Sequence, residues 1–155
     1  MQNLIHQLKY KNQKELGIFL GQWYGAELNR SPVIAQPDFV VPVPMHPRKQ
    51  RKRGYNQAEL FAAGLAETMK STLDITTLTK TTATESQTRK GRLSRWENVK
   101  EVFSLSDARH FENKNIMLVD DVITTGATLE ACGQMLLKVP GAKISIAAIA
   151  TAGIC

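Results

Sequence analysis

Cysteine is scarce in this chain of 155 residues, which contains only Cys132 and Cys155. Two cysteines are too few for a disulfide framework or a four-ligand zinc site, so the sequence favours a reducing compartment. No apolar run approaches the length of a membrane span, and the first residues lack the basic start, long apolar stretch and cleavage site of a signal peptide. We therefore expect a cytoplasmic protein with no membrane insertion.

Internal repeats and linkers are also lacking, and the length is that of one ordinary domain. We expect a single domain over residues 1–155, with an N-terminal helix within residues 1–30 and a core over residues 38–155. The 20 basic residues outnumber the 14 acidic ones and give a net charge of +6. This excess favours anionic partners such as phosphates or nucleic acid, without choosing between them.

The first half of the chain predicts helix, strand, loop and helix. Apolar residues recur at helical spacing in Glu15–Leu28, and we expect this face to pack in the core, although an interface would give the same pattern. Phe39–Pro44 predicts a strand that continues into a loop over Pro42–Tyr55. Asn56 and Glu59 then form a capping box for a second helix.

The second half predicts two further buried strands around one helix. A weaker strand, Ile75–Thr79, leads into the polar stretch Thr81–Asn98, which has few apolar anchors and is a candidate flexible lid. The remaining predicted elements are a strand at Ile116–Val119, a helix at Leu129–Lys138 and a strand at Ile144–Ala150. This order indicates an α/β fold with a mainly parallel central sheet flanked by helices.

Two adjacent acids, Asp120 and Asp121, follow the apolar run of the strand predicted at Ile116–Val119. Ligands of open parallel sheets lie beyond the carboxyl ends of the strands, where these acids are expected. The next small residues can surround a phosphate with backbone N–H groups at a helix N-terminus; they are Thr124, Thr125, Gly126, Ala127 and Thr128. Because carboxylates repel phosphate, the acids should contact another part of the ligand, and the vicinal hydroxyls of a ribose 5-phosphate meet that need.

A simpler interpretation of this stretch is a well-capped junction between a strand and a helix. Threonine and aspartate are both good N-cap residues, so the acids alone do not exclude it. The full order of apolar strand, two acids, two spacers, Thr-Thr-Gly-x-Thr and amphipathic helix favours the ligand site.

The segment Ile116–Thr128 resembles the phosphoribosyl-pyrophosphate (PRPP) binding motif of type I phosphoribosyltransferases. Four further stretches are similar, in order, to the pattern of the ComF family, which is associated with competence and DNA uptake; they are Val41–His46, Arg51–Gln57, Ser86–Gln87, and Arg95 with Asn98, Val99 and Phe103. The resemblance covers roughly residues 4 to 150. It differs in one respect, because many family members begin with a cysteine-rich zinc-binding segment that this sequence does not show.

This resemblance implies the type I phosphoribosyltransferase fold and assigns roles to the motif residues. It places Asp120 and Asp121 on the ribose hydroxyls as catalytic residues and Thr124–Thr128 around the 5-phosphate. It also implies a pyrophosphate-binding loop after the first core strand, for which the candidates are Met45, His46, Arg48 and Arg53. Mg²⁺ is the implied cofactor, carried by pyrophosphate and contacted by Asp120.

The run Arg48–Arg53 places five cations in six residues directly after the proline-rich strand end. Such a run is often only solvated or serves as a nucleic-acid contact. If the two apolar strands are neighbours in a parallel sheet, however, this loop and the acidic pair emerge at one edge, where cations and Mg²⁺ stabilise departing pyrophosphate. In the candidate lid, a second cationic patch includes Arg89, Arg92 and Arg95, and closure would exclude water.

The leading hypothesis is a phosphoribosyltransferase that binds PRPP and transfers phosphoribosyl to a nitrogen acceptor, which the sequence does not identify. The alternative is a nucleotide-binding or single-stranded-DNA-binding component of competence DNA uptake that works with a helicase-like partner. The basic loop supports this alternative. The acidic pair opposes it, because a module that binds a polyanion gains nothing electrostatically from two carboxylates.

Overall fold

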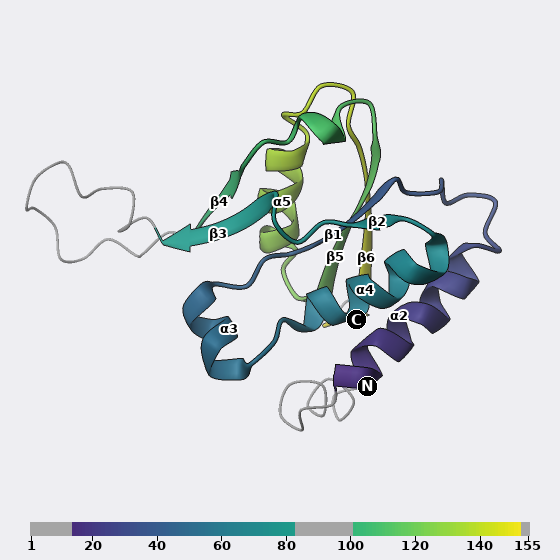
Figure 1. Cartoon of the computed structure of the whole chain (residues 1–155), viewed down its shortest axis with the longest axis horizontal. Coiled ribbons are helices and arrows are strands. Elements are labelled where there is room, and N and C mark those ends of the chain that lie inside the picture. The colour runs from purple at the N-terminus through teal and green to yellow at the C-terminus, as the bar shows by residue number, and fades with distance from the viewer. Residues whose placement is uncertain (1–13, 83–100, 153–155) are drawn as a thin grey trace, which may run out of the picture.

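The computed structural model describes residues 14–82 and 101–152 (Figure 1). Its elements, in chain order, are α2 (Lys14–Leu28), β1 (Phe39–Pro42), α3 (Pro47–Arg53), α4 (Gln57–Met69), β2 (Thr72–Leu73), β3 (Leu78–Thr82), β4 (Glu101–Leu105), the 3-10 helix η1 (Arg109–Phe111), β5 (Asn115–Ile123), α5 (Ala127–Leu136) and β6 (Lys143–Thr151). No helix in these two ranges combines the length and apolar character needed to cross a bilayer.

The central sheet has four parallel strands in the order β2-β1-β5-β6. Strands β1 and β5 are apolar runs with consecutive buried residues, as expected for strands covered on both faces. Strands β3 and β4 form a separate antiparallel hairpin, with Leu78 opposite Leu105 and Thr82 opposite Glu101. The α/β fold with a parallel central sheet is therefore confirmed.

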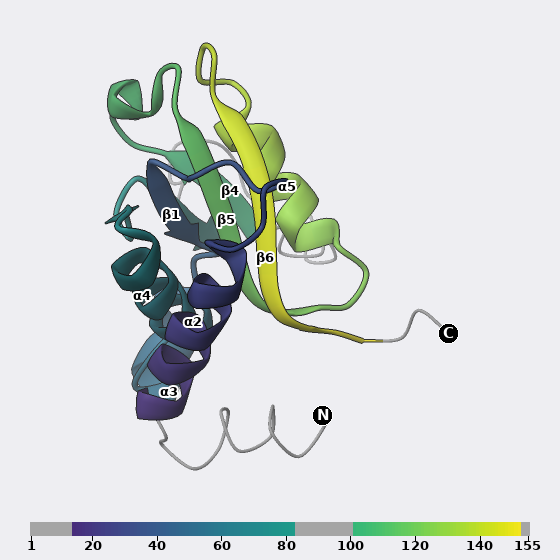
Figure 2. The same cartoon turned by 90° about the vertical axis from the view of Figure 1, so that its right-hand side faces the viewer.

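Helices cover both faces of this sheet (Figure 2). On one face, α4 and α2 pack over side chains that alternate along the strands, such as Val40, Met117 and Val119. On the opposite face, α5 packs over the other set, which includes Val41 and Leu118. Since successive strand residues point to opposite faces, the side-chain direction of each residue after Val119 follows from the same alternation.

The packing of α2 differs from the prediction. Its buried residues are Gly17, Gly21 and Gly25, whereas Phe19 and Trp23 are each 60% exposed. Glycines four residues apart lie on one face of a helix, and without side chains they allow the backbone of α2 to approach that of α4. The expectation that the large apolar residues of this helix lie in the core is wrong for Phe19 and Trp23.

Several predicted boundaries also change. The segment predicted as a loop contains α3, whose start is fixed by Pro47 in the first turn and a side-chain cap from His46. The weak strand begins later than predicted, at Leu78, and pairs with β4, which the sequence pattern did not predict. Asn56 caps α4 as predicted, since its side-chain oxygen accepts a hydrogen bond from the backbone N–H of Ala58 at 3.2 Å.

Candidate functional site

The acidic pair and the start of the basic segment lie at the same edge of the sheet, because β1 and β5 are parallel neighbours. Pro42 is opposite Val119, and the backbone N–H of Val43 donates to the carbonyl of Val119 at 2.7 Å. Asp120 therefore lies just beyond the part of β5 that pairs with β1. Strand β5 itself continues to Ile123, where it pairs with β6. The predicted adjacency of the two strands and their loops is confirmed (Figure 1).

The two acids point to opposite faces of the sheet. Leu118 lies in the core beneath α5 and Val119 in the core beneath α4, so alternation directs Asp120 towards α5 and Asp121 towards α4. Electrostatics agree, since the pKa of the Cys132 thiol in α5 is raised to about 12, chiefly by burial and also by the charge of Asp120. The two carboxylates are adjacent in sequence but lie on opposite faces of the sheet at this edge.

Asp120 is a perturbed carboxyl group. Burial raises its pKa from 3.8 to about 6, and the neighbouring charge of Asp121 acts in the same direction. A hydrogen bond from the backbone N–H of Asp121 to Asp120 Oδ1, at 2.8 Å, and the charge of Lys80 partly oppose this rise. Ionised Asp120 therefore destabilises the folded protein at neutral pH, as carboxylates held in place for binding commonly do.

Asp120→Asn should therefore make the protein more stable at pH 7–8. The full pKa shift corresponds to about 3 kcal/mol, which solvent screening of this half-buried group lowers to about 1–2 kcal/mol. Because the folded pKa is raised, the penalty is present above pH 6 and vanishes as the pH falls below 3.8. Urea unfolding at several pH values should thus show a gain that shrinks towards pH 4.

The matched control for this substitution is Glu112→Gln, which removes one negative charge from an exposed position. It should not give the same pH-dependent gain. A variant Asp120→Asn that is less stable than the wild type at pH 8 would contradict the assignment of a buried, destabilising carboxylate.

The threonine loop connects β5 to α5 and forms, with Asp120, the lining of a small open hollow. Gly126 is the N-cap of α5 and adopts a left-handed φ of 78°, which glycine accommodates without strain. The N-cap itself makes no side-chain capping bond, in contrast to His46 on α3 and Asn56 on α4. The backbone N–H of Ala127, the first residue of α5, donates to Thr125 Oγ1 at 3.4 Å, so a threonine makes a local capping contact, as the simpler interpretation expects. The binding of a phosphate by the amides of this loop stays a prediction.

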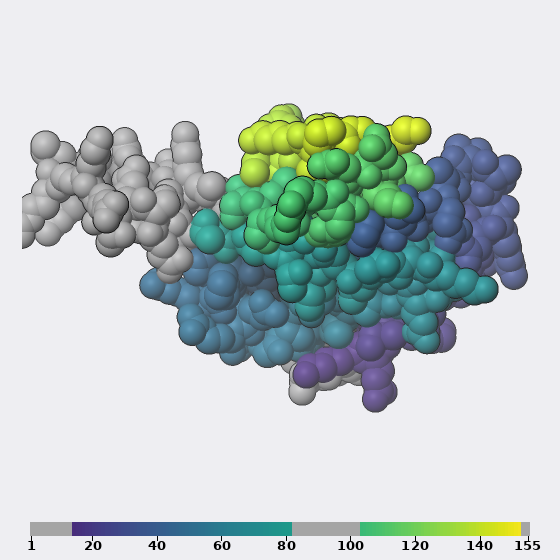
Figure 3. All heavy atoms as spheres, turned by 45° about the horizontal axis from the view of Figure 1, so that its top comes forward, coloured from purple at the N-terminus to yellow at the C-terminus, as the bar shows by residue number. Residues whose placement is uncertain are grey.

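The basic segment is the helix α3, not a loop. Its cations Arg48, Lys49, Arg51 and Lys52 are exposed, and Figure 3 shows this helix in blue at the lower left of the surface. Arg53 differs from them because it is half-buried and donates from Nη1 to Gln57 Oε1 at 3.1 Å. The two predicted pyrophosphate ligands Arg48 and Arg53 therefore have different surroundings.

His46 and Gln57 flank α3 and are both buried, with 8% and 2% exposure. His46 Nδ1 accepts a hydrogen bond from the backbone N–H of Arg48 at 3.2 Å, so the neutral ring carries its proton on Nε2. In this tautomer Nε2–H is a hydrogen-bond donor, but the atom is shut off from solvent in this conformation. Gln57 was missed by sequence reasoning, although a polar residue on the core-facing side of a helix is an available signal.

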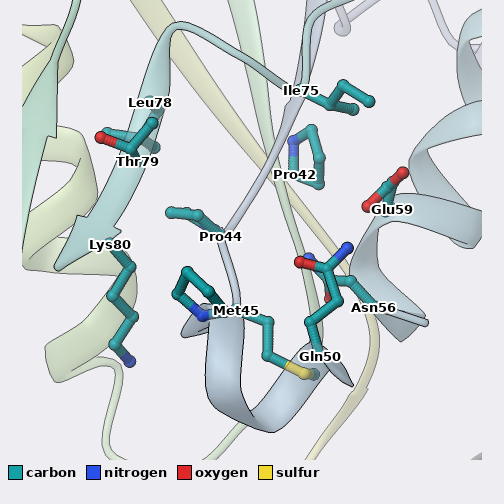
Figure 4. Close-up of a pocket in the computed structure, with 11 residues that line it drawn as sticks. Pro42, Pro44, Met45, Gln50, Asn56, Glu59, Ile75, Leu78, Thr79 and Lys80 are labelled. Carbon is teal, nitrogen blue, oxygen red and sulfur yellow. The ribbon is translucent and has the colours of Figure 1, made fainter. Parts of the chain in front are cut away.

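A second, larger hollow lies beside the loop after β1 (Figure 4). Met45 lines it, together with Gln50 of α3, Glu59 of α4 and Thr79 and Lys80 of β3. Lys80 also acts on the pKa of Asp120. This lysine was not predicted, because its place near the acids depends on the β3–β4 hairpin, and it adds a cation to the edge.

The first two residues of the predicted lid, Thr81 and Thr82, belong to strand β3. The rest of the predicted lid, with Arg89, Arg92 and Arg95, lies outside the described residues. Asp74 precedes β3 and contacts His110, which follows β4, so it links the two ends of the β3–β4 hairpin. Asp74 Oδ1 accepts from the N–H groups of Thr76 and Thr77 at 2.9 Å, and Oδ2 contacts His110 Nε2 at 2.9 Å. Burial acts to raise the pKa of Asp74, but these hydrogen bonds outweigh it and the pKa lies below 3.8.

The predicted Mg²⁺ would be shared between this edge and a bound ligand. Among residues 14–82 and 101–152, no three histidine, cysteine or acidic side chains converge to hold a metal. Mg²⁺ usually keeps several waters and takes one or two carboxylates together with phosphate oxygens. Asp120, which lines the hollow of the threonine loop, is placed to supply such a contact.

Comparison with known sequences gives a consistent result. The phosphoribosyl transferase domain model matches residues 55–155. The DNA utilization protein YhgH of Salmonella typhi is 32% identical over 146 residues, a match covering 92% of this chain and 63% of that protein. Competence protein F of Haemophilus influenzae is 32% identical over 157 residues, covering 96% of this chain and 67% of that protein. The chain thus spans slightly less than two thirds of the first relative.

Solved structures agree on the fold. The adenine phosphoribosyltransferase of Saccharomyces cerevisiae superposes with a TM-score of 0.55 at 16% identity, covering 93% of this chain and 73% of that chain. A purine phosphoribosyltransferase of Pyrococcus horikoshii gives 0.51 at 19% identity, with 88% and 72% covered. At these identities the likeness concerns the fold alone, and it confirms the predicted type I phosphoribosyltransferase fold.

Proposed function

Since the chain belongs to the phosphoribosyl transferase domain family, in its ComF branch, we propose that it binds PRPP and transfers phosphoribosyl to a nitrogen acceptor. The observation that carries this proposal is the shared edge of β1 and β5. There, Asp120 and the N-terminus of α5 line one hollow, and the basic segment begins beside them. An acid beside an anion site suits a ligand that carries both hydroxyls and phosphates.

In the proposed complex, each part of PRPP meets complementary groups. The 5-phosphate accepts hydrogen bonds from the backbone of Thr124–Thr128 at the N-terminus of α5. The ribose hydroxyls donate to Asp120 and Asp121, which approach from the two faces of β5. Pyrophosphate lies towards the loop after β1, where Arg48 and Arg53 are its proposed donors; the Nε2–H of His46 could join them only if the ligand uncovered it.

The reaction is a displacement at C1 of the ribose. The lone pair of the acceptor nitrogen forms the new bond to C1 while the bond from C1 to oxygen breaks, and its electron pair leaves with pyrophosphate. The nitrogen then loses its proton to solvent. Asp120 and Asp121 orient the ribose and offset the positive charge that develops on the ring, and the cations of α3 stabilise the leaving group. Mg²⁺, when bound, neutralises part of the pyrophosphate charge.

Calorimetric titration with PRPP in the presence of Mg²⁺ tests binding directly. Release of pyrophosphate in the presence of ammonia or single nucleobases then tests transfer. A wild-type protein that gives no binding heat and no PRPP-dependent protection against thermal unfolding would overturn the proposal.

Single-stranded DNA is a second candidate ligand, favoured by one observation. Helix α3 exposes Arg48, Lys49, Arg51 and Lys52 within two turns, and the relatives named above are called DNA utilization and competence proteins. Cations that contact DNA phosphates release counterions, so binding weakens with salt.

Arg51→Ala/Lys52→Ala should flatten the salt dependence of single-stranded DNA binding. Each lost phosphate contact lowers the slope of log K against log salt by about 0.7, which gives about 1.4 for the pair. Fluorescence anisotropy with a labelled oligonucleotide at several salt concentrations measures this slope. The double variant Lys138→Ala/Lys143→Ala, which removes two exposed lysines from α5's end and β6, is the control. Equal slopes in both variants would remove α3 from consideration.

A further inference from the structure

Two buried donors at this edge have no acceptor. Among the buried side-chain nitrogen and oxygen atoms of the described segments, His46 Nε2 and Gln57 Nε2 are those without a hydrogen-bond partner. A buried unsatisfied donor is costly to stability, so few are retained without a reason. Both fall at the ends of one short segment, residues 46–57, that contains the basic helix.

The carboxamide of Gln57 is fixed in orientation. Its Oε1 accepts from Arg53 Nη1 at 3.1 Å, and this identifies the opposite end of the amide as the Nε2 donor. Gln57 is the first residue of α4, directly after Asn56, whose Nδ2 donates to the carbonyl of Val43 at 3.0 Å. Through Asn56, the turn that presents Gln57 is tied to the end of β1.

The burial of Gln57 shows how it can act. The side chain is 2% exposed and its Nε2 is shut off from solvent, so in this conformation a ligand does not reach that atom. Its Oε1, by contrast, accepts a hydrogen bond from Arg53, which is only half-buried and lies nearer the surface. A methionine of similar length would fill the same space without the unsatisfied donor, yet it could not hold the guanidinium.

We propose that Gln57 is a positioning residue that holds the Arg53 guanidinium in place to bind the pyrophosphate group. This rests on the proposed function, which assigns Arg53 to pyrophosphate. The buried amide is retained at a cost to stability because an arginine side chain has many rotamers, and fixing one beforehand removes part of the entropy lost on binding.

The test titrates inorganic pyrophosphate with Mg²⁺ into wild type, Gln57→Met, Arg53→Ala and the double variant. Arg53→Ala should weaken pyrophosphate binding by about tenfold or more, as expected for a lost charged hydrogen bond. Gln57→Met should weaken it by roughly threefold to tenfold, without lowering the melting temperature of the free protein. In the Arg53→Ala background, Gln57→Met should have no further effect, because its target is absent.

A matched control is Gln134→Met, the same change at an exposed glutamine of α5, which should alter neither quantity. A Gln57→Met protein that binds pyrophosphate as the wild type does, while Arg53→Ala binds it less well, would overturn the role of Gln57 alone. Additive effects in the double variant would also overturn it. A wild type that binds neither pyrophosphate nor PRPP would instead overturn the proposed function.

Discussion

Asp120→Asn/Asp121→Asn should weaken PRPP binding by roughly 100-fold or more in a calorimetric titration with Mg²⁺. Hydrogen bonds from ligand hydroxyls to ionised carboxylates are worth about 1.5–3 kcal/mol each, and the substitution replaces both acceptors with neutral amides. The single variants should show unequal losses. Asp120 lines the hollow of the threonine loop, whereas Asp121 lies on the α4 side of the same strand.

Inorganic phosphate separates ribose recognition from general charge effects in this experiment. If the acids bind hydroxyls, the double variant should bind phosphate as well as the wild type or better, because two repelling charges are gone. Equal affinities of variant and wild type for PRPP would refute the assignment of the acids to ribose. If the loss appears only with Mg²⁺ present, Asp120 acts through the metal.

The pH dependence of PRPP binding follows from the same carboxyl group. The pKa of Asp120 is raised to about 6, so the acid is largely ionised at pH 7.5 and becomes protonated as the pH falls through 6. If Asp120 binds the ribose as proposed, PRPP binding should weaken as the pH falls through 6, while the cost of the ionised carboxylate to the fold disappears. Such opposite requirements of binding and stability are characteristic of functional sites.

The edge of the sheet could be predicted from the sequence because its determinants are local. The apolar runs at Val40–Val43 and Ile116–Val119 fix two buried strands, and parallel neighbours end at one edge. The small residues Thr124–Thr128 indicate a tight turn at a helix N-terminus. Each strand and the turn depend on neighbours within a few positions, whereas the adjacency of the two strands was a condition of the prediction, which the structure confirms.

The remaining features depend on tertiary contacts or on patterns other than apolar periodicity. Helix α3 has no apolar residue beyond Pro47, so its ends, and not its periodicity, define it. Lys80 acts on Asp120 although the two are distant in sequence, and the strand that carries Lys80 pairs with β4 across the segment 83–100. For Gln57 the sequence offers only a polar residue on the core-facing side of a helix, and its bond to Arg53 is known only from the structure.

Gly64→Ala should destabilise the protein by roughly 3 kcal/mol, because α2 packs directly on the backbone of α4. A Cβ at Gly64 would lie 2.1 Å from the carbonyl oxygen of Ile18 and 2.8 Å from the backbone nitrogen of Gln22. A Cβ at Gly21 would meet the carbonyl oxygen of Phe61 at 2.2 Å. These are backbone atoms, so a change of side-chain rotamer cannot relieve the clash and the helices must separate. The expected loss of stability is therefore near the upper end of the range of about 1–3 kcal/mol that is typical of overpacked cores.

The control for this prediction is Gly133→Ala in α5, where a Cβ would meet no atom within 4 Å. There the gain in helix propensity acts alone, and stability should rise by up to about 1 kcal/mol. Urea unfolding followed by circular dichroism gives both values. Because the same propensity gain favours Gly64→Ala, a net loss isolates the clash between α2 and α4. If Gly64→Ala were as stable as Gly133→Ala, the close approach of the two helices would be refuted. The covered face of α4 would then have to be packed by the large side chains of α2, including Phe19 and Trp23.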